Sequence, residues 1–235
     1  MPARIFVLRH GQTAENKNKI VQGQLDTALD ETGLQQARET AEYFSNGAKF
    51  DVAWSSDLQR ARKTAEIILD KQQESNETEP VRLRLDEDLR ERHLGEAQGK
   101  HRGILKDIPG VEKDDVFCHR ILRWWDTMLD DIIKEPGTGA DAGKTVLVVT
   151  HGGVLNRLTE KLVKRSELRS FRWIEEGPRT KGLGKHGNCC ITEYEVESDG
   201  VGTVVVTVKR AGDISHLMSE VREDNVDVQS GDGVV

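Results

Sequence analysis

Short apolar runs alternate along the chain with stretches that have the periodicity of a helix. Residues Ile5 to Leu8 form a continuous apolar run that predicts a buried strand, and residues 146–149 form another. Elsewhere apolar residues recur every three or four positions, which is the spacing of one helix face. The predicted strands cover 5–8, 52–54, 81–85, 146–149, 189–196 and 202–211, and the predicted helices cover 34–44, 58–68, 121–132 and 155–162.

Strands that alternate with helices predict an α/β domain with a mostly parallel sheet. The uninterrupted run 146–149 supports this fold, because a strand that is covered on both faces needs no polar alternation. Thr32 stands where a cap of the helix 34–44 is expected. No repeat or Pro/Gly-rich linker divides the chain, so we expect one domain over residues 1–216. Residues 217–235 are polar and acidic, and we expect a disordered tail there.

Polar and reactive side chains follow four of the predicted strands. The first strand is followed by Arg9-His10-Gly11, the second by Ser55-Ser56, the third by the segment 87–95 and the fourth by Thr150-His151-Gly152-Gly153. In open α/β sheets, ligands bind beyond the carboxyl ends of the strands. The sequence therefore predicts a ligand site at this edge of the sheet.

Composition and charge narrow the classes of protein that fit. Hydrophobic residues make up 36% and charged residues 32% of the chain, which is typical of a soluble globular protein. The net charge is −7, and much of it lies from Asp213 onward, where six acidic residues face one basic residue. No apolar run approaches the roughly 20 residues of a membrane helix, and the N-terminal sequence lacks the pattern of a secretory signal peptide.

The cysteines are few and unevenly placed. Cys118, Cys189 and Cys190 are odd in number and two are adjacent, so we expect neither a disulfide framework nor a structural metal site. A reducing compartment fits this usage. We therefore expect a cytoplasmic protein, with the nucleus as an alternative, and no membrane partner.

His10 is the first candidate for chemistry. A histidine at the end of a strand is more often structural, but here Arg9 precedes it directly. A neighbouring cation favours the neutral imidazole, which is a nucleophile that can form covalent intermediates. We expect Gly11 to let the backbone turn tightly against the ring and to help fix its tautomer.

Arg60 and His151 indicate an anion site rather than a metal site. With Ser56 or Asp57 as the cap, Arg60 would lie in or near the first turn of the helix 58–68 and reach back over the preceding strand. His151 follows a strand and precedes two glycines, as His10 follows another strand. Two histidines with two arginines suit tetrahedral phosphoryl oxygens, whereas metals prefer histidine with carboxylates or thiolates. The alternative for Arg60 is a surface arginine on a charged helix.

Two carboxylic acids in the segment "LRERHLGEAQGK" are candidate proton donors. Expulsion of an alkoxide from phosphorus needs a proton, and a carboxyl group in a pocket can supply it. Glu91 and Glu96 both stand among basic residues, and from the residues alone either could be a solvated loop acid.

Five motifs in order give the chain a resemblance to the histidine phosphatase superfamily, the phosphoglycerate mutase-like proteins. The resemblance covers roughly residues 4 to 216. The motifs are "RHGQT" with Asn16, "QGQLDTALDETGLQQA", "SSDLQRARKTA", "LRERHLGEAQGK" and "VTHGG". It implies a three-layer α/β sandwich, with a mostly parallel central sheet and helices on both faces.

The resemblance also implies roles for individual residues. His10 is similar to the family's phosphohistidine nucleophile, and Arg9, Arg60 and His151 are similar to its phosphate pocket. Glu91 matches the family's proton donor, which decides between Glu91 and Glu96. The positions that contact substrate in the family correspond to Asn16, Gln22, Gly23 and Gly152. The implied reaction uses no metal and no cofactor: His10 attacks phosphorus, Glu91 protonates the leaving oxygen, and water then releases phosphate.

Within this family, the sequence favours a phosphatase that acts on small phosphorylated metabolites. The mutases of the family carry a long insertion with an adjacent arginine pair between the acid and the second histidine. Here 59 residues lie between Glu91 and His151 and contain no such pair, and Leu94 stands where mutases have tyrosine. A phosphoglycerate mutase that depends on a phosphorylated cofactor is the alternative, and a fructose-2,6-bisphosphatase-like activity is a narrower form of the main interpretation.

Two further classes are weaker alternatives. A scaffold member of the family would be expected to lack a catalytic residue, and all five expected residues stand here. Residues 161–186 hold eight Lys/Arg against three acids, which would suit nucleic acid, but the segment has few aromatic residues and is better explained as a solvated face. The sequence does not predict the oligomeric state.

Overall fold

The central sheet brings strands from both ends of the chain together. The computed structural model describes residues 2–74, 79–103, 108–134, 143–165, 171–175, 186–198 and 203–218. Within these residues the sheet has seven strands in the order β3-β2-β4-β1-β6-β7-β5. The strands are β1 (Ala3–Arg9), β2 (Val52–Ser55), β3 (Leu83–Leu85), β4 (Thr145–Thr150), β5 (Phe171–Glu175), β6 (Ile191–Ser198) and β7 (Val204–Asp213). Among them β6 runs against the direction of the others, so the sheet is mostly parallel.

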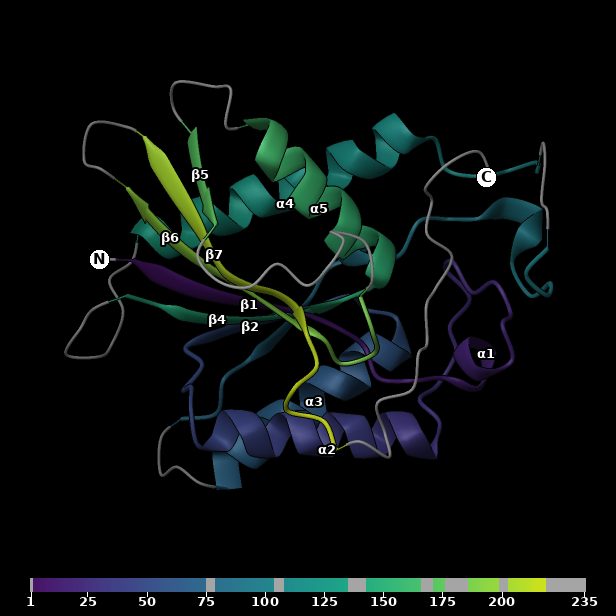
Figure 1. Ribbon diagram of the computed structural model, residues 1–235, viewed down its shortest axis with the longest axis horizontal. Helices are drawn as coiled ribbons and strands as arrows, with labels where there is room; N and C mark the ends of the chain where they lie inside the picture. Colours follow the sequence, from purple (N-terminus) through teal and green to yellow (C-terminus); the bar gives the residue numbers. More distant parts are fainter. Residues whose placement is uncertain are drawn as a thin grey trace.

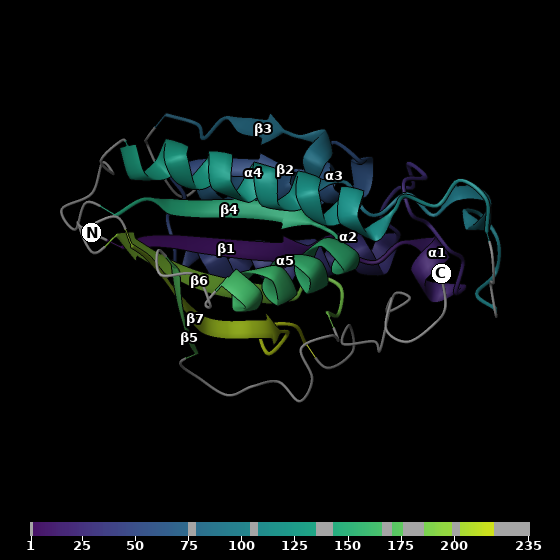
Figure 2. The same ribbon diagram turned by 90° about the horizontal axis from the view of Figure 1, so that it is seen from above.

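Helices cover both faces of this sheet (Figure 1). The helices are α1 (Ala14–Lys17), α2 (Glu31–Ser45), α3 (Gln59–Glu74), α4 (Asp114–Lys134) and α5 (Gly152–Arg165), with 3-10 turns η1 (Glu87–Leu89) and η2 (Gly95–Ala97). Helices α2 and α3 lie on one face, and α4 and α5 lie on the other, as both views show (Figure 2). The predicted three-layer α/β sandwich is confirmed.

The pattern of side chains along the two central strands explains these layers. Successive residues of a strand point to opposite faces. Ile5 and Val7 pack in a core with apolar residues of α4 and α5, whereas Phe6 and Leu8 pack in a second core with residues of α2 and α3. Residues 146–149 of β4 divide between the same two cores in the same alternating way. A strand with two buried faces needs an unbroken apolar run, and this is what the sequence has.

Some local predictions were wrong or incomplete. Asp30, not Thr32, caps α2, since its Oδ1 accepts a hydrogen bond from the Gly33 amide at 2.8 Å. Strand β5 was not predicted, because residues 161–186 had been interpreted through their charge. The structure describes little of that segment beyond the end of α5 and β5, and it describes nothing after residue 218 of the predicted tail. No helix in the described part of the chain is long and apolar enough to cross a membrane.

Candidate active site

The carboxyl ends of β1 and β4 place two histidines side by side. The strands are parallel neighbours in which Arg9 pairs with Thr150, and both point toward the end of the molecule where α1 lies (Figure 2). The His10 amide donates to the carbonyl of Thr150 at 2.9 Å, which continues the pairing beyond the strands. The rings of His10 and His151 have centroids 5.1 Å apart. The predicted convergence of these two strand ends is confirmed.

The hydrogen bonding of His10 fixes which ring nitrogen is available. Its Nδ1 lies 2.7 Å from the carbonyl oxygen of Gly11. Because a carbonyl only accepts, Nδ1 carries the proton and Nε2 holds the lone pair. Burial of the ring, then the charges of Arg60 and Arg9, hold the pKa of His10 well below its ordinary value, although the bond to Gly11 acts in the opposite direction. His10 is therefore a neutral imidazole with an unprotonated Nε2.

Gly11 is needed here for close packing. A Cβ at Gly11 would lie 2.5 Å from the carbonyl oxygen of Gly33, and one at Gly33 would lie 2.0 Å from that of Gln12. The loop after β1 thus rests directly on the first turn of α2, where it brings the Gly11 carbonyl to the His10 ring. The expected role of Gly11 in fixing the tautomer is confirmed through its carbonyl.

Two buried guanidinium groups lie beside the histidines. Arg9 is fully buried, and its Nη1 donates to the carbonyl of His186 at 2.6 Å. Arg60 is the second residue of α3, so the prediction that it lies in the first turn is confirmed. Its guanidinium donates to the carbonyls of Gly23 at 2.8 Å and Leu25 at 2.6 Å. Two buried cations next to two neutral imidazoles make a site that favours an anion.

His151 is completely buried and bonded to a serine. Its Nε2 lies 2.9 Å from Oγ of Ser56, which also accepts a hydrogen bond from the Leu58 amide. Burial, followed by the charge of Arg60, holds the pKa of His151 well below its ordinary value. Within the described part of the chain, Nδ1 of His151 has no hydrogen-bond partner. A bound oxyanion could supply one.

Glu91 is held at the start of α5. Its Oε2 accepts a hydrogen bond from the Gly153 amide at 2.9 Å, and its Oε1 accepts one from the Arg92 amide at 2.8 Å. A Cβ at position 153 would lie 2.2 Å from Oε1 of Glu91, so the second glycine after His151 makes room for the carboxylate. Glu96, by contrast, is exposed on η2. Of the two candidate acids, Glu91 is therefore the one that contacts the segment directly after His151.

The residues predicted to contact substrate surround the same centre. The carbonyl of Gly23 accepts a hydrogen bond from Arg60, which connects Gly23 to this centre. Gly23 has a φ of +53°, and a Cβ at this position would lie 2.3 Å from Oε1 of Gln98. The preceding Gln22 is buried, and within the described residues its Nε2 has no hydrogen-bond partner. Gly152 begins α5 about a van der Waals distance from the Arg9 side chain, since a Cβ there would lie 3.7 Å from Arg9 Nε. Gly23 thus needs the absence of a side chain for its packing against Gln98, whereas Gly152 is in ordinary contact with Arg9.

Asn16 joins the site through a residue that the sequence analysis missed. Its Oδ1 accepts hydrogen bonds from the Thr13 amide at 3.2 Å and from Nδ2 of Asn188 at 3.3 Å. The same Nδ2 donates to the carbonyl of His10 at 3.0 Å. Asn188 thus connects α1 to the backbone of His10. Asn188 stands in the motif "HGNCC" directly before β6. Because β6 is antiparallel to β1, the residues that precede β6 lie at the edge of the sheet where β1 ends. A single sequence does not reveal that direction.

Buried His186 makes the stability of the fold depend on pH. Burial, followed by the charge of Arg9, lowers the pKa of His186 to about 4. The unfolded chain takes up this proton near pH 6.5, so stability from the neutral ring is present above that pH and is lost as the pH falls toward 4. We expect His186→Phe to reduce the slope of unfolding free energy against pH by up to about 1.4 kcal/mol per pH unit between pH 6 and 5.

Urea unfolding of both proteins at a series of pH values measures this slope. The matched control is His119→Phe, because His119 is exposed on α4. His10 and His151 keep part of the dependence in every variant. Equal slopes for wild type and His186→Phe would contradict the prediction.

Comparisons with known proteins agree with the geometry. The sequence pattern of the histidine phosphatase superfamily (branch 1) matches residues 5–209. The chain is 31% identical to phosphoglycerate mutase-like protein 4 of Arabidopsis thaliana over 240 residues, and this similarity covers 98% of this chain and 92% of that protein. A broad-specificity phosphatase of Saccharomyces cerevisiae is 31% identical over 172 residues, covering 68% of this chain and 70% of the relative.

Solved structures share the fold. Mycobacterial glucosyl-3-phosphoglycerate phosphatase superposes with a TM-score of 0.68 at 26% identity, covering 89% of this chain and 98% of that chain. The relatives by sequence and by structure are thus phosphatases and phosphoglycerate mutase-like proteins. With two buried histidines, two buried arginines and a carboxylate at one edge of this sheet, the chain belongs to the histidine phosphatase superfamily.

Proposed function

We propose that this protein is a phosphomonoester hydrolase that works through a phosphohistidine and needs no metal. The observation that carries the proposal is His10, a neutral imidazole whose Nε2 is available beside Arg9, Arg60 and His151. Such a group can attack phosphorus while the neighbouring donors stabilise the charge on the phosphoryl oxygens. The two guanidinium groups supply the positive charge that Mg²⁺ supplies in other phosphoryl-transfer sites.

The proposed first step transfers the phosphoryl group to the enzyme. The lone pair on Nε2 of His10 forms the P–N bond as the P–O bond to the alcohol breaks. Arg9, Arg60 and His151 hold the equatorial oxygens, and Glu91 gives its proton to the departing oxygen. The alcohol leaves, and Glu91 remains as a carboxylate. Asn16, Gln22, Gly23 and Gly152 line the position of the substrate.

The second step releases inorganic phosphate. Glu91 takes a proton from water as the water oxygen attacks phosphorus, and the P–N bond breaks. The electron pair returns to Nε2, so His10 is again neutral and Glu91 is again protonated. The same carboxylate thus acts as acid and then as base, which requires that it stay in one place through both steps.

The electrostatics suit work at acidic pH. A protonated His10 has no lone pair on Nε2, so activity falls as the pH passes below the pKa of that ring. Because burial and the two arginines lower this pKa, the nucleophile stays neutral well below pH 6.5. This supports an acid-type histidine phosphatase.

Substrate class and location are part of the proposal. We infer small phosphorylated metabolites as substrates, in line with the name of the mycobacterial relative, which acts on glucosyl-3-phosphoglycerate. Cys118, Cys189 and Cys190 are all free and buried. Free thiols of this kind fit a reducing compartment, and we infer the cytoplasm.

Release of phosphate from an aryl phosphate in the presence of EDTA tests the function. We expect turnover with the chelator present, and turnover on sugar, glycerate or nucleotide phosphates when these are screened. Activity that appears only on addition of a divalent metal would overturn the metal-free mechanism. No phosphate release from any ester would overturn the hydrolase.

Glu91→Gln should separate substrates by their leaving group. The amide cannot donate the carboxylic proton, so we expect kcat/KM for an alkyl phosphate to fall by about 100-fold or more. Dinitrophenyl phosphate, whose leaving group departs without a proton, should lose far less. Glu96→Gln is the matched control, and we expect it to leave both substrates unchanged. An equal loss on both substrates in Glu91→Gln would contradict its role as proton donor.

A phosphoglycerate mutase is the second candidate. It is favoured by the similarity over 98% of the chain to phosphoglycerate mutase-like protein 4. A mutase would return the phosphoryl group to glycerate rather than to water. Incubation of the phosphorylated enzyme with phosphoglycerates, followed by analysis of the products, distinguishes transfer from hydrolysis.

A further inference from the structure

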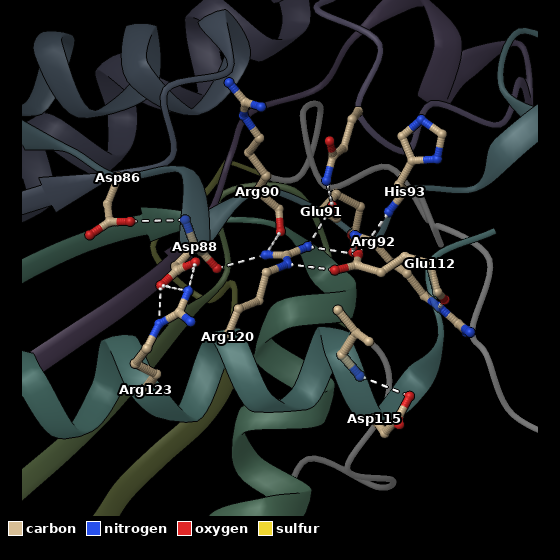
Figure 3. A network of polar contacts seen from close by, with 12 residues as sticks. Asp86, Asp88, Arg90, Glu91, Arg92, His93, Glu112, Asp115, Arg120 and Arg123 are labelled. Atoms are coloured by element: carbon tan, nitrogen blue, oxygen red, sulfur yellow. Dashed lines mark hydrogen bonds and ion pairs between the residues drawn. The ribbon is translucent and has the colours of Figure 1, made fainter. Parts of the chain in front are cut away.

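One arginine on α4 holds the main chain of the loop that carries Glu91. Nη1 of Arg120 donates to the carbonyls of Asp88 at 2.6 Å and Arg90 at 2.7 Å, and Nη2 donates to the carbonyl of Glu91 at 3.0 Å. Figure 3 shows this guanidinium at the centre of the loop, with its donors directed at the backbone. Since the contacts are to carbonyl groups, Arg120 fixes the path of the chain at Glu91 itself.

Glu112 completes the coordination of this arginine. Its Oε1 accepts from Nε of Arg120 at 2.8 Å and its Oε2 accepts from Nη2 at 3.0 Å. An arginine has five N–H donors, and with these two bonds all five of Arg120 are used. The two side chains are 11% and 12% exposed, so this ion pair is largely removed from solvent. A lysine, with three donors and no planar fork, could not make the same set of bonds.

Glu112 also holds the chain on the far side of Glu91. Its Oε2 accepts from the His93 amide at 3.1 Å. Its own amide donates to the His93 carbonyl at 2.8 Å, and its carbonyl accepts from Nε of Arg92 at 2.8 Å. The pair Arg120–Glu112 therefore binds the loop on both sides of Glu91 (Figure 3).

The helix that presents Arg120 is itself fixed. Phe117, Ile121 and Trp125 of α4 are buried in the core. Asp114 of α4 forms an ion pair with Arg157 of α5 at 3.0 Å. Helix α5 in turn holds the Glu91 carboxylate through the Gly153 amide. The main chain of Glu91 and its carboxylate are thus held by two helices that are joined to each other.

We propose that Arg120 and Glu112 are positioning residues for proton transfer by Glu91, an inference that rests on the proposed function. Transfer requires the carboxyl group within about 2.6–3.2 Å of the leaving oxygen, and a displacement of about 1 Å can lower the rate 100-fold. The pair removes this freedom from the loop. Loss of the pair should therefore slow phosphoryl transfer when the leaving group needs a proton, and should spare it when the leaving group departs without one.

A comparison of leaving groups tests the proposal. We measure kcat/KM of Arg120→Lys and Arg120→Gln for β-glycerol phosphate, which needs a proton, and for dinitrophenyl phosphate, which does not. The ratio of the two values reports only the dependence on the acid, and the fraction of folded enzyme cancels because both substrates are measured on one preparation. We expect this ratio to fall about 10- to 100-fold in both variants.

Arg123→Gln is the matched control. Arg123 lies three residues further along α4 and binds the same loop through the Asp88 side chain, but 60% of its own side chain is exposed. We expect its ratio to equal that of wild type. Glu112→Gln serves as a second variant if the Arg120 variants do not fold, because the glutamine keeps an oxygen that can accept from the His93 amide. We expect the ratio of the two kcat/KM values to fall in this variant as well.

The possible results distinguish the positioning role of Arg120 from the proposed hydrolase function. An equal loss on both substrates in the Arg120 variants, or the same change in Arg123→Gln, overturns the positioning role and leaves the hydrolase standing. Wild-type enzyme that releases no phosphate from either ester overturns the hydrolase, and the positioning role falls with it.

Discussion

His10→Ala is expected to lower phosphate release from an aryl phosphate by about 10,000-fold or more, because the proposed covalent intermediate forms on the imidazole that this substitution removes. His151 has its Nε2 bonded to Ser56, and in the proposed step its other nitrogen, Nδ1, donates to a phosphoryl oxygen. Arg9 and Arg60 are cations and cannot attack. Binding of phosphate should persist in the variant, since these two arginines remain.

Brief incubation with ³²P-labelled ester, followed by denaturation, measures the intermediate directly. Wild type should retain a label that is stable to alkali and lost in acid, as expected of a phosphoramidate, and His10→Ala should retain none. His119→Ala is the control, because His119 lies exposed on α4. A variant that keeps its unfolding temperature and still hydrolyses at the wild-type rate would contradict the nucleophile assignment. A label stable to acid would point to an ester on another side chain.

The periodicity of the sequence was sufficient to predict an α/β domain with a mostly parallel sheet, whereas the three-layer arrangement was implied by the resemblance to the family. Buried parallel strands leave an unbroken apolar run, and helices on each face leave steps of three and four, so both signals are local. Strand β5 was missed because "FRWIE" lies among basic residues and the alternation is short. The cap of α2 was misplaced because Asp30 and Thr32 are both good caps, and the backbone path that selects Asp30 depends on contact with Gln12.

The sequence predicted those residues of the site that stand at the carboxyl ends of parallel strands. His10 and His151 each come directly after a parallel strand, and Arg60 lies in the first turn of the helix that follows β2. Glu91 follows the parallel strand β3, and the resemblance to the family decided between it and Glu96. Asn188 and the Arg120–Glu112 pair depend on tertiary contacts instead: one on the reversed direction of β6, the other on where α4 crosses the acid loop. Neither feature leaves a pattern in the chain, because the partners are separated by 172 and 29 residues.

Arg60→Gln is expected to have two effects with different signatures. Loss of one cationic donor to the phosphoryl oxygens should lower kcat/KM by about 100- to 1,000-fold. After burial, Arg60 is the largest influence that lowers the pKa of His10, so its removal raises that pKa. Since only the neutral ring attacks, the acidic limb of the kcat/KM profile should move to higher pH. The substrate's own ionisation is the same in both assays and does not contribute to the difference.

The second signature distinguishes an electrostatic role from a merely structural one. Arg60 also binds the carbonyls of Gly23 and Leu25, so its loss could disturb the loop without any effect on the imidazole. A disturbed loop lowers activity equally at all pH values, whereas a lost charge beside His10 shifts the limb. Arg62→Gln is the control, because Arg62 lies on the same helix but is exposed and bonded to Glu66. If the limb stays where it is in wild type, the charge of Arg60 does not keep His10 neutral, and burial with the charge of Arg9 must do so.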